Sequence, residues 1–102
     1  MISVKVTYTV NADFLQQNKQ NIHNFLMDLK KLANCNFMYN VFLLDDGLTF
    51  LHIAMYECEE DQQIVLNVPS FLKFQQERDQ SNLIHKPEFK EISLIGSSLS
   101  LV

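Results

Sequence analysis

The pattern of hydrophobic and polar positions predicts one strand followed by one amphipathic helix in the first third of the chain. From residue 2 to residue 10, apolar and polar side chains alternate, with Thr7 on the polar side. Alternation with a period of two is typical of a half-buried β-strand. Apolar residues between Phe14 and Leu32 then recur near a spacing of 3.6, which predicts a helix that begins with a capping box at Asp13.

Two apolar runs and a broken helix follow. Residues 37–44 and 48–56 are apolar at most positions, and the Asp-Asp-Gly sequence between them is a turn signal that predicts a β-hairpin. Acidic residues at 59–61 suit the positive end of a helix dipole, and Pro69 interrupts the helix that they begin. Residues 89–95 form the last predicted strand.

The resulting order is strand, helix, strand, strand, helix, strand, which predicts an α+β fold of the ferredoxin-like βαββαβ type. The composition is 47% hydrophobic and 20% charged, with two glycines and two prolines, as expected for a compact domain. A chain of 102 residues suits one core, so we expect a single domain over residues 1–102.

The predicted sheet has too much apolar surface for its two helices to cover. Right-handed crossovers send both helices to one side, yet both hairpin strands carry large apolar groups on both faces. Four strands present roughly 500 Å² of sheet face, which is near the largest apolar patch that a monomer tolerates. A second identical chain is the simplest cover, so we expect a homodimer that forms a dimeric α+β barrel with a cavity between its sheets. A different protein is the alternative cover.

The register of the hairpin decides which residues share a face. A three-residue loop at 45–47, with glycine in the left-handed region, sets Asn40 opposite His52. A two-residue loop shifts the pairing by one residue and sets His52 opposite Val41. We prefer the first register because it makes the two polar side chains cross-strand neighbours.

His52 and Asn40 are the candidate catalytic residues. A histidine in a buried strand could accept a proton near physiological pH, and Asn40 could hold a developing oxyanion. The alternative is a structural histidine that Asn40 satisfies by hydrogen bonding. In the preferred register the same cavity is lined by candidate ligand-binding residues, namely Thr7, Met38, Phe42, Phe50 and Tyr56.

Several function classes are not expected. A net charge of −4 with scattered Lys and Arg residues does not suit nucleic-acid binding, and no apolar run approaches the length of a membrane span. The amino-terminal residues lack the pattern of a secretory signal, so we expect a cytoplasmic protein. Three separated histidines, two cysteines and two glycines provide neither a metal motif nor a phosphate-binding loop. We therefore expect no metal and no cofactor.

Four features of the sequence resemble a known family. They are the predicted strand order, the turn sequence at 42–47, the strand that carries His52, and the sequence Val-Pro-Ser-Phe-Leu-Lys-Phe at 68–74. The chain is similar to the antibiotic biosynthesis monooxygenase-like group of the dimeric α+β barrel superfamily, in which a Ser-Pro-x-Phe-x-x-Phe-like stretch often marks a broken second helix. The resemblance implies cofactor-independent oxygenases of polycyclic aromatics or haem-degrading enzymes, with sites beneath the helices or between the sheets. Tryptophan is common in those sites and this chain has none. No catalytic residue is therefore transferred from the family.

These observations lead to two hypotheses of function. The first is a homodimeric domain that binds a small aromatic or apolar molecule and, in its enzymatic form, oxidises that molecule without metal or flavin. His52 would then be the base and Asn40 the oxyanion-binding group. The second is a non-catalytic assembly or metabolite-sensing module, in which apolar side chains fill the cavity.

Overall fold

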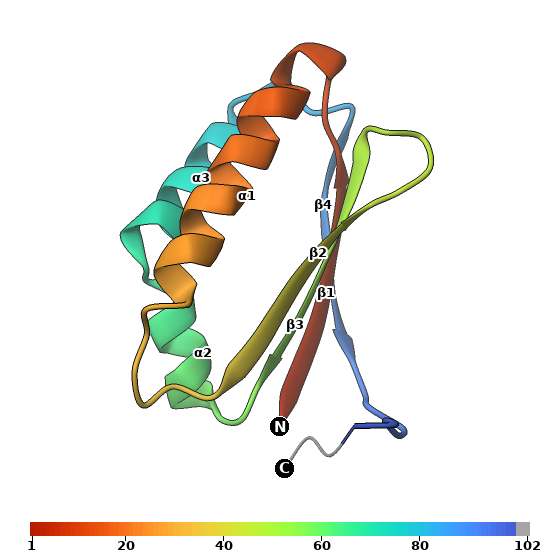
Figure 1. The fold of residues 1–102 in the computed structure, drawn as a ribbon. Coiled ribbons are helices and arrows are strands. Elements are labelled where there is room, and N and C mark those ends of the chain that lie inside the picture. Colours follow the sequence, from red (N-terminus) through yellow and green to blue (C-terminus); the bar gives the residue numbers. More distant parts are fainter. Residues whose placement is uncertain (100–102) are drawn as a thin grey trace.

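The structure is a computed structural model that describes residues 1–99, so the last three residues of the predicted domain lie outside the described part. It confirms the α+β fold and the βαββαβ order (Figure 1). The elements are β1 (Ile2–Thr9), the short 3₁₀ helix η1 (Ala12–Phe14), α1 (Leu15–Leu29), β2 (Phe37–Leu43), β3 (Thr49–Tyr56), α2 (Glu59–Leu66), α3 (Pro69–Asp79) and β4 (His85–Ile92).

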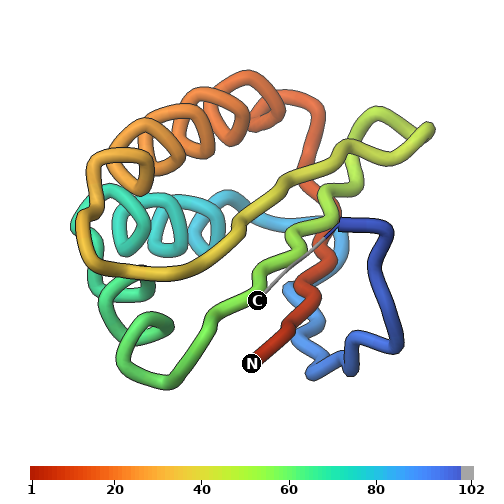
Figure 2. The backbone as a smooth tube through the Cα atoms, turned by 60° about the horizontal axis from the view of Figure 1, so that its bottom comes forward, coloured from red at the N-terminus to blue at the C-terminus, as the bar shows by residue number. Residues whose placement is uncertain are grey.

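The four strands form one antiparallel sheet in the order β2-β3-β1-β4. The helices lie together on one side of this sheet, and α1 packs along α3 (Figures 1 and 2). We call the side of the sheet that faces the helices the inner face and the opposite side the outer face. The core lies between the inner face and the helices, where Tyr8, Phe25 and Phe74 are almost completely buried.

Pro69 divides the second helical region into α2 and α3. Val68 before it is extended, with φ −63° and ψ 127°, because a residue that precedes proline is driven out of the helical region. Pro69 itself occupies the first turn of α3, where its missing N–H would have no helical partner. The predicted break is thus confirmed, and it directs Phe71 and Phe74 into the core.

Several element boundaries differ from the prediction. The capping box at Asp13 does not form, because η1 precedes α1 and no side chain caps either helix start. The last strand begins at His85 rather than at residue 89, since the backbone N–H of Ile84 already bonds to Thr9. The strand ends at Ile92, which pairs with Ser3 near the start of β1. A longer β4 would therefore soon extend past the start of β1, where few residues remain for it to pair with.

The predicted register of the hairpin is wrong. The loop has four residues, 45–48, because the Asp46 carboxylate accepts the backbone N–H groups of Leu48 and Thr49 while the Gly47 N–H bonds to the carbonyl of residue 44. Gly47 adopts φ 74°, in the left-handed region that favours glycine. His52 is therefore paired with Val41.

A shift of one residue reverses the face of every side chain on a strand relative to its neighbours. His52 lies on the inner face and is buried, whereas Asn40 pairs with Ile53 on the outer face. The outer face carries Met38 and Phe42, whose side chains are 40% and 51% exposed, and no element of residues 1–99 covers it. No helix in the described chain has both the length and the apolar character of a membrane span.

Candidate functional site

A cavity of about 180 Å³ lies between the inner face and the helices α2 and α3. Apolar side chains from the sheet and from both helices form most of its walls, including Val6, Ala54 and Phe71. Phe89 on β4 is 58% exposed and marks the solvent end of the cavity. Six polar residues also line it: Tyr39, His52, Tyr56, Gln62, Gln75 and Arg78. An apolar hollow with a few convergent polar groups is the usual form of a small-molecule site.

His52 stands at the centre of a buried hydrogen-bond network. Its Nε2 atom lies 2.7 Å from the hydroxyl of Tyr8 on β1, and its Nδ1 atom lies 2.7 Å from the hydroxyl of Tyr39 on β2. Asn18 on α1 donates from Nδ2 to the Tyr8 hydroxyl at 3.0 Å. The three neighbouring strands and α1 thus converge on one imidazole ring.

The order of donors in this network follows from counting protons. Asn18 meets Tyr8 through its Nδ2 donor, so the acceptor left for the Tyr8 proton among residues 1–99 is Nε2 of His52, and we assign the Tyr8 hydroxyl as the donor to Nε2. A neutral imidazole has one N–H and one acceptor nitrogen, so Nδ1–H of His52 donates to the Tyr39 oxygen. The Tyr39 proton has no acceptor among residues 1–99 and is free to donate into the cavity that Tyr39 lines.

Burial keeps all members of this network uncharged at neutral pH. It lowers the pKa of His52 from 6.5 to about 3, and the positive charge of Arg78 acts in the same direction. Burial also raises the pKa of Tyr8 and of Tyr39 well above 10, and it raises the pKa of Tyr56 to about 12. The site therefore presents a neutral imidazole held between two protonated phenols.

Arg78 brings a positive charge to the same cavity from α3. Its guanidinium carbon lies 5.3 Å from the ring centre of Tyr8 and 5.2 Å from that of Phe74. Its Nε atom donates to the carboxylate of Asp79 at 3.0 Å. The residue is 8% exposed, and its two Nη groups have no acceptor within the described chain.

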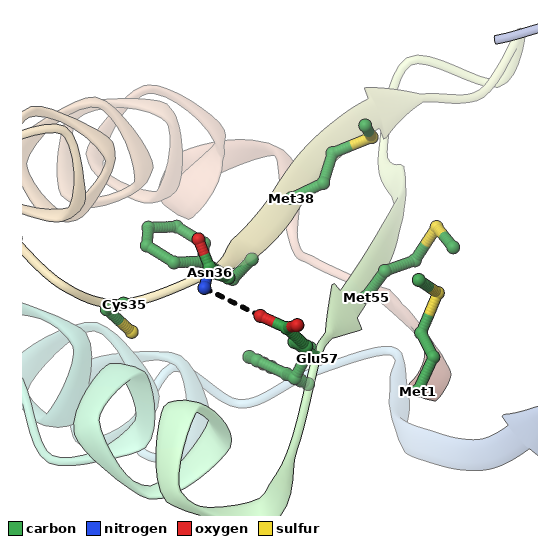
Figure 3. Close-up of a pocket in the computed structure, with 8 residues that line it drawn as sticks. Met1, Cys35, Asn36, Met38, Met55 and Glu57 are labelled. Carbon is green, nitrogen blue, oxygen red and sulfur yellow. Dashed lines mark hydrogen bonds between the residues drawn. The ribbon is translucent and has the colours of Figure 1, made fainter. Parts of the chain in front are cut away.

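A second, larger pocket of about 440 Å³ lies at one end of the sheet (Figure 3). Met1, Met38 and Met55 occupy one side of it, and Asn36 donates to the Glu57 carboxylate at 2.6 Å. Asn36 and Glu57 thus satisfy each other, and Met38 and Met55 belong to the apolar outer face. Among residues 1–99, no three His, Cys, Asp or Glu side chains gather closely enough to hold a metal ion. We therefore place the candidate site at the smaller cavity.

The structure divides the residues proposed from the sequence between two faces. His52 and Tyr56 line the helix-side cavity, and Phe50 lies beside Tyr8 on the same face with ring centres 5.5 Å apart. The remaining candidates lie on the outer face, namely Thr7, Met38, Asn40 and Phe42. The predicted pairing of Asn40 with His52 is thus wrong, and Asn40 is not available to the cavity that His52 lines.

Sequence reasoning missed Tyr39 and Arg78. Tyr39 alternates with Phe37 and Val41, so the correct register would have placed it beside His52. Arg78 is the only arginine in the sequence and follows Phe71 and Phe74 at helical spacing, which puts it on the buried face of α3. Those two patterns were the available signals.

Comparison with known proteins identifies the fold. Neither a family model nor a curated protein matches the sequence. A crystal structure of an antibiotic biosynthesis monooxygenase superposes with a TM-score of 0.79 and 9% identity, covering 94% of this chain and 100% of that one. Rv0793 from Mycobacterium tuberculosis superposes with a TM-score of 0.79 and 10% identity, covering 96% and 98%.

A variant of SnoaB, a cofactor-independent oxygenase from Streptomyces nogalater, superposes with a TM-score of 0.73 and 11% identity, covering 97% of each chain. Identities this low carry information about the fold and not about the reaction. The chain has the fold of the antibiotic biosynthesis monooxygenase structures, as the sequence resemblance implied.

Proposed function

We propose that the protein is a homodimeric small-molecule-binding domain whose ligand occupies the cavity between the inner face and the helices. The observation that carries this proposal is the grouping of Tyr39, His52 and Arg78 in a cavity whose walls are mostly apolar. The Tyr39 hydroxyl proton and the Nη groups of Arg78 have no acceptor among residues 1–99, so both are available to a ligand in the cavity. The ligand expected from this lining is aromatic or apolar with a polar end.

A cavity-filling substitution tests the binding site. Ala54 is buried on β3 and lines the cavity, so Ala54→Leu should fill space that the ligand needs. Ala12→Leu is the matched control, because it makes the same change at an exposed position. A screen of small aromatic compounds by protein NMR should give shifts at Tyr39 and Phe71 that disappear only in Ala54→Leu. Equal shifts in both variants would contradict the proposed location.

Dimerisation is supported by the composition of the outer face. Its β2 and β3 half carries Met38, Phe42 and Ile53, and a twofold axis would let this one apolar patch cover its own copy. Analytical ultracentrifugation should give twice the 11.9 kDa chain mass. Phe42→Glu should shift the protein to monomer, whereas Leu72→Glu, at a residue of α3 that is 47% exposed, should leave the dimer unchanged. A wild-type monomer at micromolar concentration would contradict this part of the proposal.

The enzymatic form of the proposal is a cofactor-independent monooxygenase. The fold similarity to SnoaB supports it at the level of architecture. In such a reaction a CH₂ group of the substrate becomes C=O while the second atom of O₂ leaves as water. The proton that the substrate first loses would pass to solvent water, because both ring nitrogens of His52 are engaged, and a donor is needed for the oxyanion that forms. In this proposal the Tyr39 hydroxyl would be that donor, with His52 as the residue that positions it, because Tyr39 lines the cavity and contacts His52.

A non-catalytic metabolite sensor is the second candidate, and the state of His52 favours it. Both ring nitrogens are engaged by tyrosines and the pKa is about 3, so the imidazole is a poor base towards a ligand. Oxygen consumption without added metal or flavin separates the two candidates. Turnover that is lost in His52→Ala while the dimer persists supports the enzyme, and ligand binding without oxygen uptake supports the sensor.

A further inference from the structure

Two residues that line the helix-side cavity, Arg78 and Tyr39, bring two kinds of hydrogen-bond donor and one positive charge to it, and the charge of Arg78 is close enough to act on the pKa of Tyr39. Arg78 contributes its two Nη groups and the charge, and Tyr39 contributes its hydroxyl proton. The nearest imidazole, His52, is neutral with both nitrogens occupied, so it cannot supply a competing charge. Arg78 and Tyr39 therefore offer donors to an anionic acceptor in the cavity.

The guanidinium is fixed in a way that leaves one edge unused. The guanidinium carbon lies over the rings of Tyr8 and Phe74, and the Nε atom donates to Asp79. The side chain of Asp79 is 56% exposed, so solvent weakens its hold on the charge. The edge formed by the two Nη groups matches the two oxygens of a carboxylate, which is the geometry of a bidentate Arg–carboxylate pair.

The size of the cavity limits the rest of the ligand. A volume of about 180 Å³ is below the range of roughly 300–1,000 Å³ that holds drug-sized molecules. The apolar walls, which include Val6, Ala54 and Phe71, suit a hydrocarbon body. One ring fits this space better than several fused rings.

From these observations we infer that the cavity binds a small monocarboxylate with a single aromatic or aliphatic ring, its carboxylate held by Arg78 and Tyr39. The inference rests on the proposed function, because it specifies the ligand of the same cavity. In this arrangement Arg78 favours a negatively charged ligand, and the Tyr39 hydroxyl donates a hydrogen bond to a carboxylate oxygen. Gln62 and Gln75, which line the cavity as well, complete its polar wall.

Isothermal titration with benzoate and with its neutral analogue benzamide tests the inference on the full chain. Benzoate should bind at least about tenfold more tightly than benzamide, as a charge-assisted bidentate pair predicts. Arg78→Met should remove that preference and keep benzamide binding, and Tyr39→Phe should weaken benzoate several-fold. Lys73→Met is the control, because it removes a positive charge from the exposed side of α3 and should leave the preference intact.

The outcomes separate this inference from the proposed function. The carboxylate inference would be overturned if the wild type bound benzoate and benzamide equally well, or if the preference for benzoate survived in Arg78→Met. In either case the proposal that the cavity binds a small molecule would still stand. No binding of either probe, with no shifts that depend on Ala54, would overturn both. If Arg78→Met fails to fold, Arg78→Lys and the wild-type comparison of the two probes still decide the matter, since Arg78→Lys keeps the charge but loses the bidentate edge.

Discussion

Acid should destabilise this protein through His52 in particular. Burial holds the pKa of His52 at about 3 in the folded state, against 6.5 for the exposed side chain. At pH values between these two pKa values, the unfolded chain binds a proton at His52 that the folded chain does not bind. The free energy of unfolding therefore has its full contribution from His52 above pH 7, and this contribution is lost as the pH falls. At about 1.4 kcal/mol per pKa unit, the free energy of unfolding should drop by about 2.5 kcal/mol between pH 7 and pH 4.5 because of this residue alone.

The variant His52→Gln isolates this contribution. Glutamine keeps one donor and one acceptor in the side chain but does not titrate, and His23 and His85 are exposed and present in both proteins. Urea unfolding at equal protein concentration, followed by circular dichroism at pH 7.0, 5.5 and 4.5, gives both stabilities. The advantage of the wild type over the variant should shrink by about 2.5 kcal/mol across this range. Parallel pH profiles for the two proteins would refute the argument that His52 is buried and neutral.

Three further predictions concern the same network and its support. Tyr8→Phe leaves Nε2 of His52 and Nδ2 of Asn18 without their partner and should cost about 2 kcal/mol of unfolding free energy; a loss below about 0.5 kcal/mol, as for an exposed hydroxyl, would contradict the network. Long-range ¹H–¹⁵N spectra should show that Nδ1 of His52 is protonated and Nε2 is not. The opposite tautomer would contradict the assigned directions of the hydrogen bonds to Tyr8 and Tyr39. Gly47→Ala should cost about 1 kcal/mol because of its positive φ, measured by thermal unfolding, and an unchanged stability would show that the loop adapts.

The fold was predictable because it depends on local patterns. Alternation in β1, helical spacing in α1 and the proline between α2 and α3 each act within a few residues. The register of the hairpin depended on Asp46, whose carboxylate holds the N–H groups of two following residues and so draws Leu48 into the loop. A turn signal in the sequence locates a loop but does not fix its length, and one residue of error exchanged the two faces of β2.

The candidate site was predictable only in part for the same reason. β3 is apolar on both faces, with Leu51, Ile53 and Met55 as hydrophobic as Phe50 and Ala54, so its pattern could not tell which side His52 takes. The proposed role for Asn40 failed with the register. The spacing of Arg78 after Phe71 and Phe74 indicates the buried face of α3, but it does not tell which residues of the sheet Arg78 meets, because that depends on long-range packing.

The break at Pro69 divides the helical wall of the cavity between two separate helices. Gln62 and Leu66 come from α2, whereas Gln75 and Arg78 come from α3. A change of side-chain volume on the short helix therefore need not move the guanidinium on the longer one. Related chains could acquire new ligand preferences by replacing residues of α2, while the anchoring chemistry carried by α3 stays in position.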